Sequence, residues 1–236
     1  MKIVKTITLV ALLSVATSLS AQDITGLANY WQIGIGLGEL PMGGSFKPSL
    51  TIGYHFNEKI YAGFIYQFKD YISRNSASIN ANSAGIDGLI GSSEEVAQRF
   101  LFQVRYTPIK NGPYLSTGFV FNGKDTEEIR FDERSRVIAG ELYEGSVIIN
   151  QSRPAGWGFA LGLGYQYNFK NGFSAGFEWT PAWFQYPMPT YEFTGTANLT
   201  KVAKDTLTEK MNNKFDASVT NMYKVFHVGV GYRFKN

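Results

Sequence analysis

Few side chains in this sequence could do acid–base or nucleophilic chemistry. It contains two histidines, His55 and His227, and no cysteine. A general base must lie within hydrogen-bond reach of its nucleophile, and the residue two positions after His227 is Gly229 rather than a serine. Without cysteine, disulfides and thiolate metal sites are excluded, and no histidine spacing suggests a metal centre. We therefore predict a protein that is not an enzyme and has no catalytic, metal or cofactor-binding site.

A second set of ionisable residues suggests a charge network inside the fold. Five charged residues lie on the small or polar face of a segment in which large apolar residues alternate with small or polar ones: Glu178, Arg105, Arg233, Lys69 and Arg99. A charge buried without a partner costs several kcal/mol, so Glu178 should lie among basic side chains. We expect Arg105 to contact Glu178, with Arg233 or Lys69 nearby. Such a network could form a structural plug, or it could line a narrow gated passage.

Strands with a period of two must position these residues. From 156 to 169, large side chains beginning with Trp157 alternate with small or polar ones such as Gly158 and Gln166. Successive side chains of a strand point to opposite faces. Seven further segments show the same alternation: 31–38, 49–56, 60–69, 99–107, 114–122, 173–180 and 225–234. Because the polar face recurs with charged residues, we place it inside and the apolar face outside, as in membrane barrels.

The connections between these segments are short and long in turn. The short ones cover 57–59, 109–112 and 170–172, and two of them contain Asn-Gly, which suits the positive φ of hairpin turns. The long ones cover roughly 39–47, 72–98, 123–155 and 186–218. The prediction is an all-β fold: an eight-stranded antiparallel up-and-down transmembrane β-barrel with short periplasmic turns and long extracellular loops.

The first 21 residues have the features of a secretory signal peptide. Lys2 and Lys5 precede an apolar run, and a stretch of small residues ends at Ala21. We place the cleavage after Ala21, with a cut after Ser20 as the alternative, so that 22–236 form the barrel domain. Removing Lys2 and Lys5 leaves 20 basic against 19 acidic residues, a balance that does not suggest nucleic-acid binding.

Aromatic residues occupy the outward positions near both ends of the segments, where they would form girdles at the membrane boundary. The predicted girdle comprises Phe56, Tyr106, Tyr167, Phe169, Phe173, Tyr232, Phe234, Trp157 and Trp179. The last segment, with Val228, Val230, Tyr232 and Phe234 on one face, ends on an aromatic close to the C-terminus.

Over its mature length the chain resembles the small outer-membrane barrels of the OmpA, OmpX and OmpW type. The resemblance implies a place in the outer membrane of a Gram-negative-type bacterium, after export to the periplasm. It also implies outer-membrane lipids, lipopolysaccharide and the barrel-assembly machinery as partners. The last segment is similar to the family's assembly signal, although Lys235 and Asn236 here follow the aromatic residue that usually ends the chain.

The long loops are the candidates for recognition of an extracellular ligand, above all 123–155 and 186–218. In the first, Ile129, Phe131 and Val147 are spaced so that its two sides could extend a hairpin beyond the membrane, where strand edges can capture partners. In the second, 200–211 is expected to form a short amphipathic helix. The small, polar loop 72–98 is expected to be mobile. We predict a non-enzymatic barrel that is envelope-structural or surface-binding through its loops. Alternatives are a narrow pore, a conduit for small apolar solutes, or a lipid A-modifying enzyme.

Overall fold

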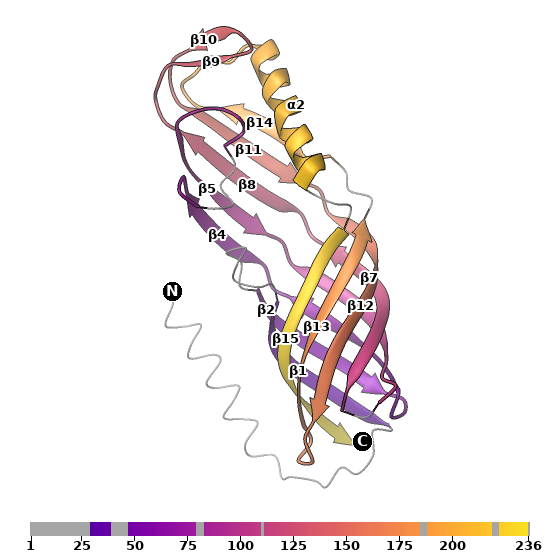
Figure 1. Ribbon diagram of the computed structural model, residues 1–236. Helices are drawn as coiled ribbons and strands as arrows, with labels where there is room; N and C mark the ends of the chain where they lie inside the picture. The colour runs from indigo at the N-terminus through magenta and orange to yellow at the C-terminus, as the bar shows by residue number, and fades with distance from the viewer. Residues whose placement is uncertain are drawn as a thin grey trace.

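The computed structural model describes residues 29–38, 47–78, 83–109, 111–184, 188–218 and 222–235. The predicted signal peptide and its cleavage site lie outside these residues, as does most of the predicted loop 39–47. The described chain has two parts. A closed barrel continues at one end into a head made of a sheet and a helix, and the C-terminal strand ends at the opposite end of the barrel (Figure 1).

Eight strands form the closed antiparallel barrel, in the order β1-β15-β13-β12-β7-β6-β3-β2. They are β1 (Tyr30–Gly38), β2 (Lys47–His55), β3 (Ile60–Gln67), β6 (Arg99–Tyr106), β7 (Pro113–Asn122), β12 (Gly156–Asn168), β13 (Phe173–Phe184) and β15 (Met222–Lys235). Each coincides with one of the predicted segments to within a few residues. The predicted fold class is therefore confirmed.

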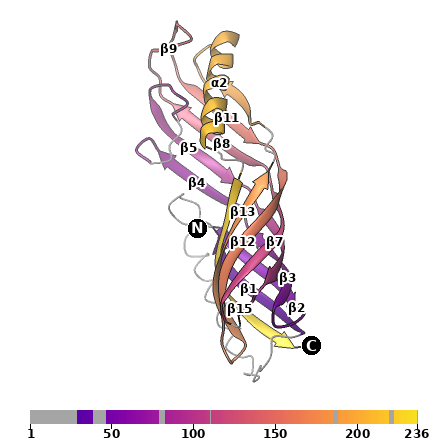
Figure 2. The same cartoon turned by 45° about the vertical axis from the view of Figure 1, so that its right-hand side comes forward.

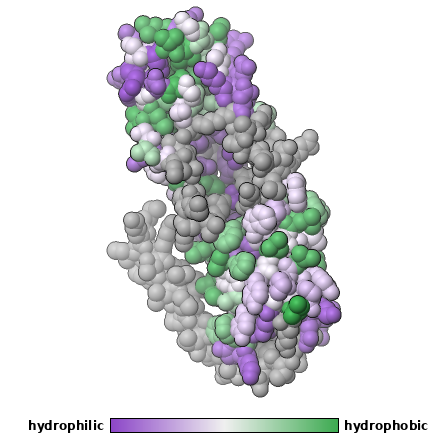
Figure 3. Space-filling model, viewed as in Figure 1, coloured by the Kyte–Doolittle hydropathy of each residue, from purple (hydrophilic) through white to green (hydrophobic). Residues whose placement is uncertain are grey.

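Alternation along each strand separates the interior from the outer wall. On β6, Arg99 and Gln103 are buried inside the barrel, whereas Phe100, Phe102 and Val104 are exposed on its outside. On the face seen in Figure 3, green and pale side chains dominate the middle of the barrel wall and purple ones gather at its lower end, whereas the head shows purple and green side chains mixed. A wall of this kind, apolar outside and polar within, is typical of barrels that cross a bilayer.

Tight turns close the end of the barrel opposite the head, as predicted. In the β2–β3 turn, the Asn57 side chain accepts hydrogen bonds from the backbone N–H groups of Lys59 and Ile60, at 2.8 and 2.9 Å. Asn111 has φ 52° and Gly172 has φ 89° in the other two turns. Asparagine and glycine are the residues that adopt this left-handed conformation most readily.

The head is built on an open five-stranded sheet in the order β14-β11-β8-β5-β4. Its strands are β4 (Asp70–Asn75), β5 (Leu89–Val96), β8 (Asp125–Phe131), β11 (Val147–Arg153) and β14 (Thr190–Thr194), and a separate two-stranded sheet pairs β9 (Arg136–Ile138) with β10 (Glu141–Tyr143). Both ends of the expected loop 72–98 are strands, because β4 and β5 pair along their length, from Asp70↔Val96 to Asn75↔Gly91. The expected mobility of the stretch between them stays a prediction. The predicted hairpin extension in 123–155 is confirmed, since β8 and β11 pair with Ile129 opposite Ile149.

Two-residue spacers join four barrel strands to four head strands. They are Phe68–Lys69 between β3 and β4, Ala97–Gln98 between β5 and β6, Gly123–Lys124 between β7 and β8, and Pro154–Ala155 between β11 and β12. The four spacers lie side by side along one side of the barrel rim, because β3, β6, β7 and β12 are neighbours in the barrel. Like β-bulges, they interrupt the regular strand pairing and change the direction of the strands. The sheet therefore leaves the barrel as a projecting blade, visible in both ribbon views (Figures 1 and 2).

Helix α2 (Lys201–Ser218) covers one face of the head sheet. The Thr200 hydroxyl accepts a hydrogen bond from the Ala203 backbone N–H at 3.4 Å, a typical N-cap contact. Ala203, Leu207 and Met211 recur every fourth residue and pack against a core that includes Ile129 and Ile149. The predicted helix at 200–211 is thus confirmed and extends further. Neither α2 nor any other helical segment in the described ranges is long and apolar enough to cross a bilayer.

Candidate functional site: the barrel interior and the open face of the head

Glu178 is the centre of the barrel interior. Its side chain is 1% exposed. It accepts five hydrogen bonds, one from its own strand and four from β6 and β7 across the interior: from Thr180 Oγ1 at 2.6 Å, and from Arg105 Nη2 at 2.7 Å, Tyr114 OH at 2.9 Å, Gln103 Nε2 at 3.1 Å and Ser116 Oγ at 3.1 Å. A buried carboxylate with this many donors stays charged without an uncompensated desolvation cost.

Arg105 provides the counter-charge and is itself held between two rings. Its guanidinium carbon lies 4.8 Å from the ring centroid of Tyr61 and 4.7 Å from that of Tyr114. A cation over aromatic faces gains about 0.5–2 kcal/mol per contact, more when it is desolvated. Arg105 Nη1 also donates to Gln166 Oε1 at 3.3 Å. The pair between Arg105 and Glu178 is therefore fixed from several sides.

Between this network and the tight-turn end lies a second polar layer. His55 Nε2 pairs with Gln32 Oε1 at 2.8 Å, and Gln166 Nε2 donates to the same oxygen at 3.1 Å. Arg233 Nη2 donates to the Phe169 backbone carbonyl at 2.9 Å. This layer closes the interior near the turns.

His227 needs space that only glycine leaves. A Cβ added at Gly36 would lie 2.4 Å from His227 Nε2, and one at Gly229 would lie 2.6 Å from His227 Cε1. The histidine therefore packs against the bare backbone of β1 and β15. This packing explains one of the glycine faces of the alternating segments.

Toward the head, the network is followed by an apolar layer and then by a charged one. The apolar layer consists of the fully buried side chains of Ile65, Leu101, Val120, Ala160 and Ala182. Beyond it, Lys47 Nζ donates to the Ala97 carbonyl oxygen, and Arg99 Nε donates to Asn122 Oδ1 at 2.6 Å. Asp125 then accepts from Asn122 at 3.2 Å and from Arg153 at 3.3 Å.

The predicted interior network is brought together only in part. Arg105 contacts Glu178 as expected, whereas Arg99 and Arg233 lie in other layers of the interior. The placement of Lys69 was wrong. It lies in a spacer after β3, its side chain is 51% exposed, and its Nζ pairs with Glu95 Oε1 at 3.1 Å.

Several residues that contact Arg105 or Glu178 went unrecognised although the alternation placed them on the inward face. Tyr61, Tyr114 and Ser116 stand at inward positions of their segments. What the alternation does not give is the stagger between strands, which decides which inward residues meet at one level of a barrel. Lys47 was assigned to a loop and is instead the first residue of β2.

The described part of the interior has little free space. A cavity of about 30 Å³ beside Arg105 is bordered by Gln32, Thr51 and Gln166. This volume holds about one or two waters. In the described ranges, no group of three or more histidine or carboxylate side chains is placed to hold a metal ion.

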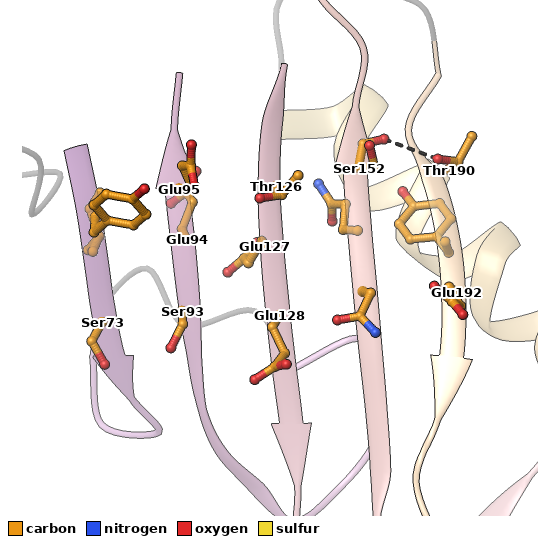
Figure 4. A pocket seen from close by; sticks show the side chains of 15 residues that line it. Ser73, Ser93, Glu94, Glu95, Thr126, Glu127, Glu128, Ser152, Thr190 and Glu192 are labelled. Atoms are coloured by element: carbon orange, nitrogen blue, oxygen red, sulfur yellow. Dashed lines mark hydrogen bonds between the residues drawn. The ribbon is translucent and has the colours of Figure 1, made fainter. Parts of the chain in front are cut away.

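A larger hollow of about 730 Å³ lies on the head, on the face of the sheet opposite α2 (Figure 4). Two rows of side chains form its walls, each with one residue from every head strand. The row nearer the barrel is Tyr71, Glu95, Thr126, Ser152 and Thr190, and the distal row is Ser73, Ser93, Glu128, Asn150 and Glu192. We call this the head groove.

The side chains under the head groove floor point to the α2 face and include a carboxylate in an unusual setting. Burial raises the pKa of Glu127, and the nearby carboxylate of Glu94 raises it further, while Arg74 opposes both. Arg74 also forms an ion pair with Glu94 at 2.6 Å. The sheet between the groove and the helix therefore carries an acidic layer.

Two solved structures, at low sequence identity, share the architecture of this chain. CarO of Acinetobacter baumannii superposes with a TM-score of 0.53 at 14% identity, covering 90% of this chain and 100% of CarO. The chain has the fold of the small outer-membrane β-barrels. CarO2 of the same organism gives 0.53 at 13% identity, covering 87% and 99%, and Ail of Yersinia pestis, the attachment invasion locus protein, gives 0.34 at 14% identity, covering 88% and 99%. No family model and no curated protein sequence matches the chain.

The predicted girdle residues lie on the outer wall of the barrel. Most of the set is exposed on the outer wall, from Trp179 at 38% to Trp157 at 68%, whereas Phe173 and Tyr232 are half-buried against each other with ring centroids 5.2 Å apart. Val228, Val230, Tyr232 and Phe234 share the outer face of β15. Their role as an assembly signal stays a prediction.

Proposed function

We propose that the chain is a closed, non-enzymatic barrel of the outer membrane that holds a binding head at the cell surface and does not conduct solutes. The observation that carries the proposal is the filled interior. A polar layer, the network of Glu178, an apolar layer and a charged layer follow one another along the described part of the barrel axis.

The apolar layer is the strongest barrier among these. Ile65, Leu101 and Val120 are at most 2% exposed and pack with Ala160 and Ala182, so five consecutive barrel strands contribute to this layer. An ion passing this level would lose its hydration without gaining a polar partner, which costs many kcal/mol. A small eight-stranded barrel encloses only enough space for its own side chains. The apolar layer therefore favours a surface-binding or structural role over the pore.

The charged layer at the mouth speaks against an apolar-solute conduit. Such a conduit needs an apolar funnel near the head, and the described residues at that level include Lys47, Arg99, Asp125 and Arg153. The lipid A-modifying alternative lacks support because neither histidine is paired with a nucleophile in the described part of the chain. His55 is paired with Gln32 rather than with a serine, and His227 is packed between glycine backbones.

The outer-membrane location rests on the apolar outer wall, the girdle and the predicted signal peptide. The same arrangement places the head outside the cell, because the tight turns would face the periplasm. The partners implied by the resemblance, including lipopolysaccharide and the assembly machinery, belong to this proposal. Recognition of an extracellular ligand would fall to the head, which is formed largely by 123–155 and 186–218 together with the β4–β5 hairpin.

Solute uptake by proteoliposomes tests the proposal. Liposomes containing the refolded full-length chain should swell in arabinose or glycine no faster than protein-free liposomes. A variant with Ile65→Gly, Leu101→Gly and Val120→Gly, which empties the apolar layer, is the positive control and should swell faster. Swelling by the unmodified chain that falls with solute size would show an open pore and overturn the closed barrel.

A further inference from the structure

The open face of the head sheet continues the lipid-facing wall of the barrel. The α2 face of the head and the barrel interior lie on the same side of the continuing strands, because Asn122 of β7 and Asp125 of β8 point inward together and hydrogen-bond. Phe121 of β7 and Thr126 of β8 are accordingly both on the outside. From Phe121 to Thr126 the chain advances five residues, which span at most about 17 Å when extended. The head groove therefore begins just above the barrel wall.

Directly below the head groove, the wall carries a band of aromatic rings. Phe100 and Phe121 have centroids 6.2 Å apart, and Phe121 and Trp157 are separated by 4.8 Å. Tyr66 joins the band at 4.7 Å from Phe100. These rings belong to β3, β6, β7 and β12, the barrel strands linked by the spacers to four of the groove's five strands. A band of this kind marks the level at which acyl chains give way to lipid headgroups.

The side chains of the two rows of the head groove carry polar groups, and some of them are acidic. Its two rows carry three carboxylates, six hydroxyl groups including that of Tyr71, and the amide of Asn150. Glu95 pairs with Lys69 at 3.1 Å and Glu128 with Arg130 at 3.7 Å, whereas Glu192 forms no ion pair with any described residue. An anionic ligand would therefore be repelled.

A protein partner also fits this surface poorly. The centre of a protein interface is usually aromatic or aliphatic and is depleted in charge. Only Tyr71 among the wall residues offers a large apolar surface, and it stands at the edge strand. A ligand with many uncharged hydroxyl groups matches the carboxylate, hydroxyl and amide groups of the two rows, since each can exchange hydrogen bonds with a sugar hydroxyl.

We propose that the head groove binds the uncharged saccharide chain of an envelope glycolipid whose acyl chains lie against the aromatic wall below. This inference rests on the proposed function, because it requires the head to stand outside the bilayer. The ligand of the open face of the head would then be a lipid of the same membrane that holds the barrel.

Binding of a defined saccharide to the full-length chain in nanodiscs tests this proposal. The probe is the uncharged polysaccharide released from lipopolysaccharide by mild acid and freed of phosphorylated core, with heparin as the anionic comparison. We expect saturable binding of the uncharged probe by calorimetry and none of heparin. Asn150→Ala should weaken the binding about tenfold, the value of one good hydrogen bond.

Ser93→Trp should abolish the binding by filling the head groove, while Ser76→Trp, the same change in the β4–β5 turn outside it, should have no effect. Absence of binding by the unmodified chain, equal effects of the two tryptophan variants, or tighter binding of heparin would each overturn the assignment. So would a self-association in sedimentation that Ser93→Trp removes, because the occupant would then be a second copy. Failure of the closed barrel shows separately in solute uptake, so the two proposals fail by different measurements.

Discussion

At the scale of single residues, the Arg105–Glu178 pair decides how the interior is held. Five donors converge on one carboxylate, and two rings enclose the guanidinium. Removing one charge of such a pair leaves the other buried without compensation, which is more damaging than never having had the pair. The interior is therefore specified by charge as well as by shape.

We predict that Glu178→Gln lowers the free energy of unfolding by about 3–5 kcal/mol, because the Arg105 guanidinium loses its buried counter-charge. Urea unfolding of the refolded chain, followed by its shifted mobility on a gel, measures this change. Glu58→Gln, the same substitution at an exposed position of the β2–β3 turn, is the matched control and should change little. Equal stability of the two variants would show that the network does not hold the barrel together.

The sequence correctly predicted which side chains face the interior within a strand, and it failed for a residue beyond the end of a strand. Arg105 and Glu178 lie in strand interiors, so alternation alone places both inside. Lys69 was assigned by continuing the alternation of β3 past Gln67, but the strand ends there and a spacer follows. The alternation carries no signal for that interruption.

At the scale of elements, the sequence identified the barrel far better than the head. Each barrel strand alternates over eight residues or more, because a lipid-facing wall and a packed interior constrain both faces. Strand β5, with the sequence LIGSSEEV, has one face toward the head core and the other toward the open groove, and its small and acidic residues resemble a loop. Pairing with β4 and β8, rather than its own pattern, makes it a strand.

Helix α2 is expected to stabilise the head independently of the barrel. Leu207 is fully buried against the sheet, so Leu207→Ala should cost about 2–5 kcal/mol by leaving a cavity. Hydrogen exchange of β8 and β11 amides in the full-length chain should accelerate, while that of barrel strands stays unchanged. Val202→Ala, at a position of the same helix that is 62% exposed, is the control. Exchange that accelerates equally in the barrel would contradict a separate head core.

At the scale of the whole molecule, one continuous set of strands forms both the closed barrel and the projecting head. Four strands pass through spacers from a closed barrel into an open sheet, and each face changes its surroundings at that level. The inner face passes from a filled interior to a core under α2, and the outer face passes from an aromatic wall to a polar groove. We therefore propose that the head binds a ligand and that the barrel is closed.

Single-channel recording of the refolded full-length chain in a planar bilayer tests this account most directly. The filled interior predicts a silent membrane at moderate voltage, with insertion shown by protection of the barrel strands from protease. The triple glycine variant of Ile65, Leu101 and Val120 should then show current steps under the same conditions. Reproducible steps from the unmodified chain, altered in size by Glu178→Gln, would contradict the closed barrel and assign the network to a gated passage.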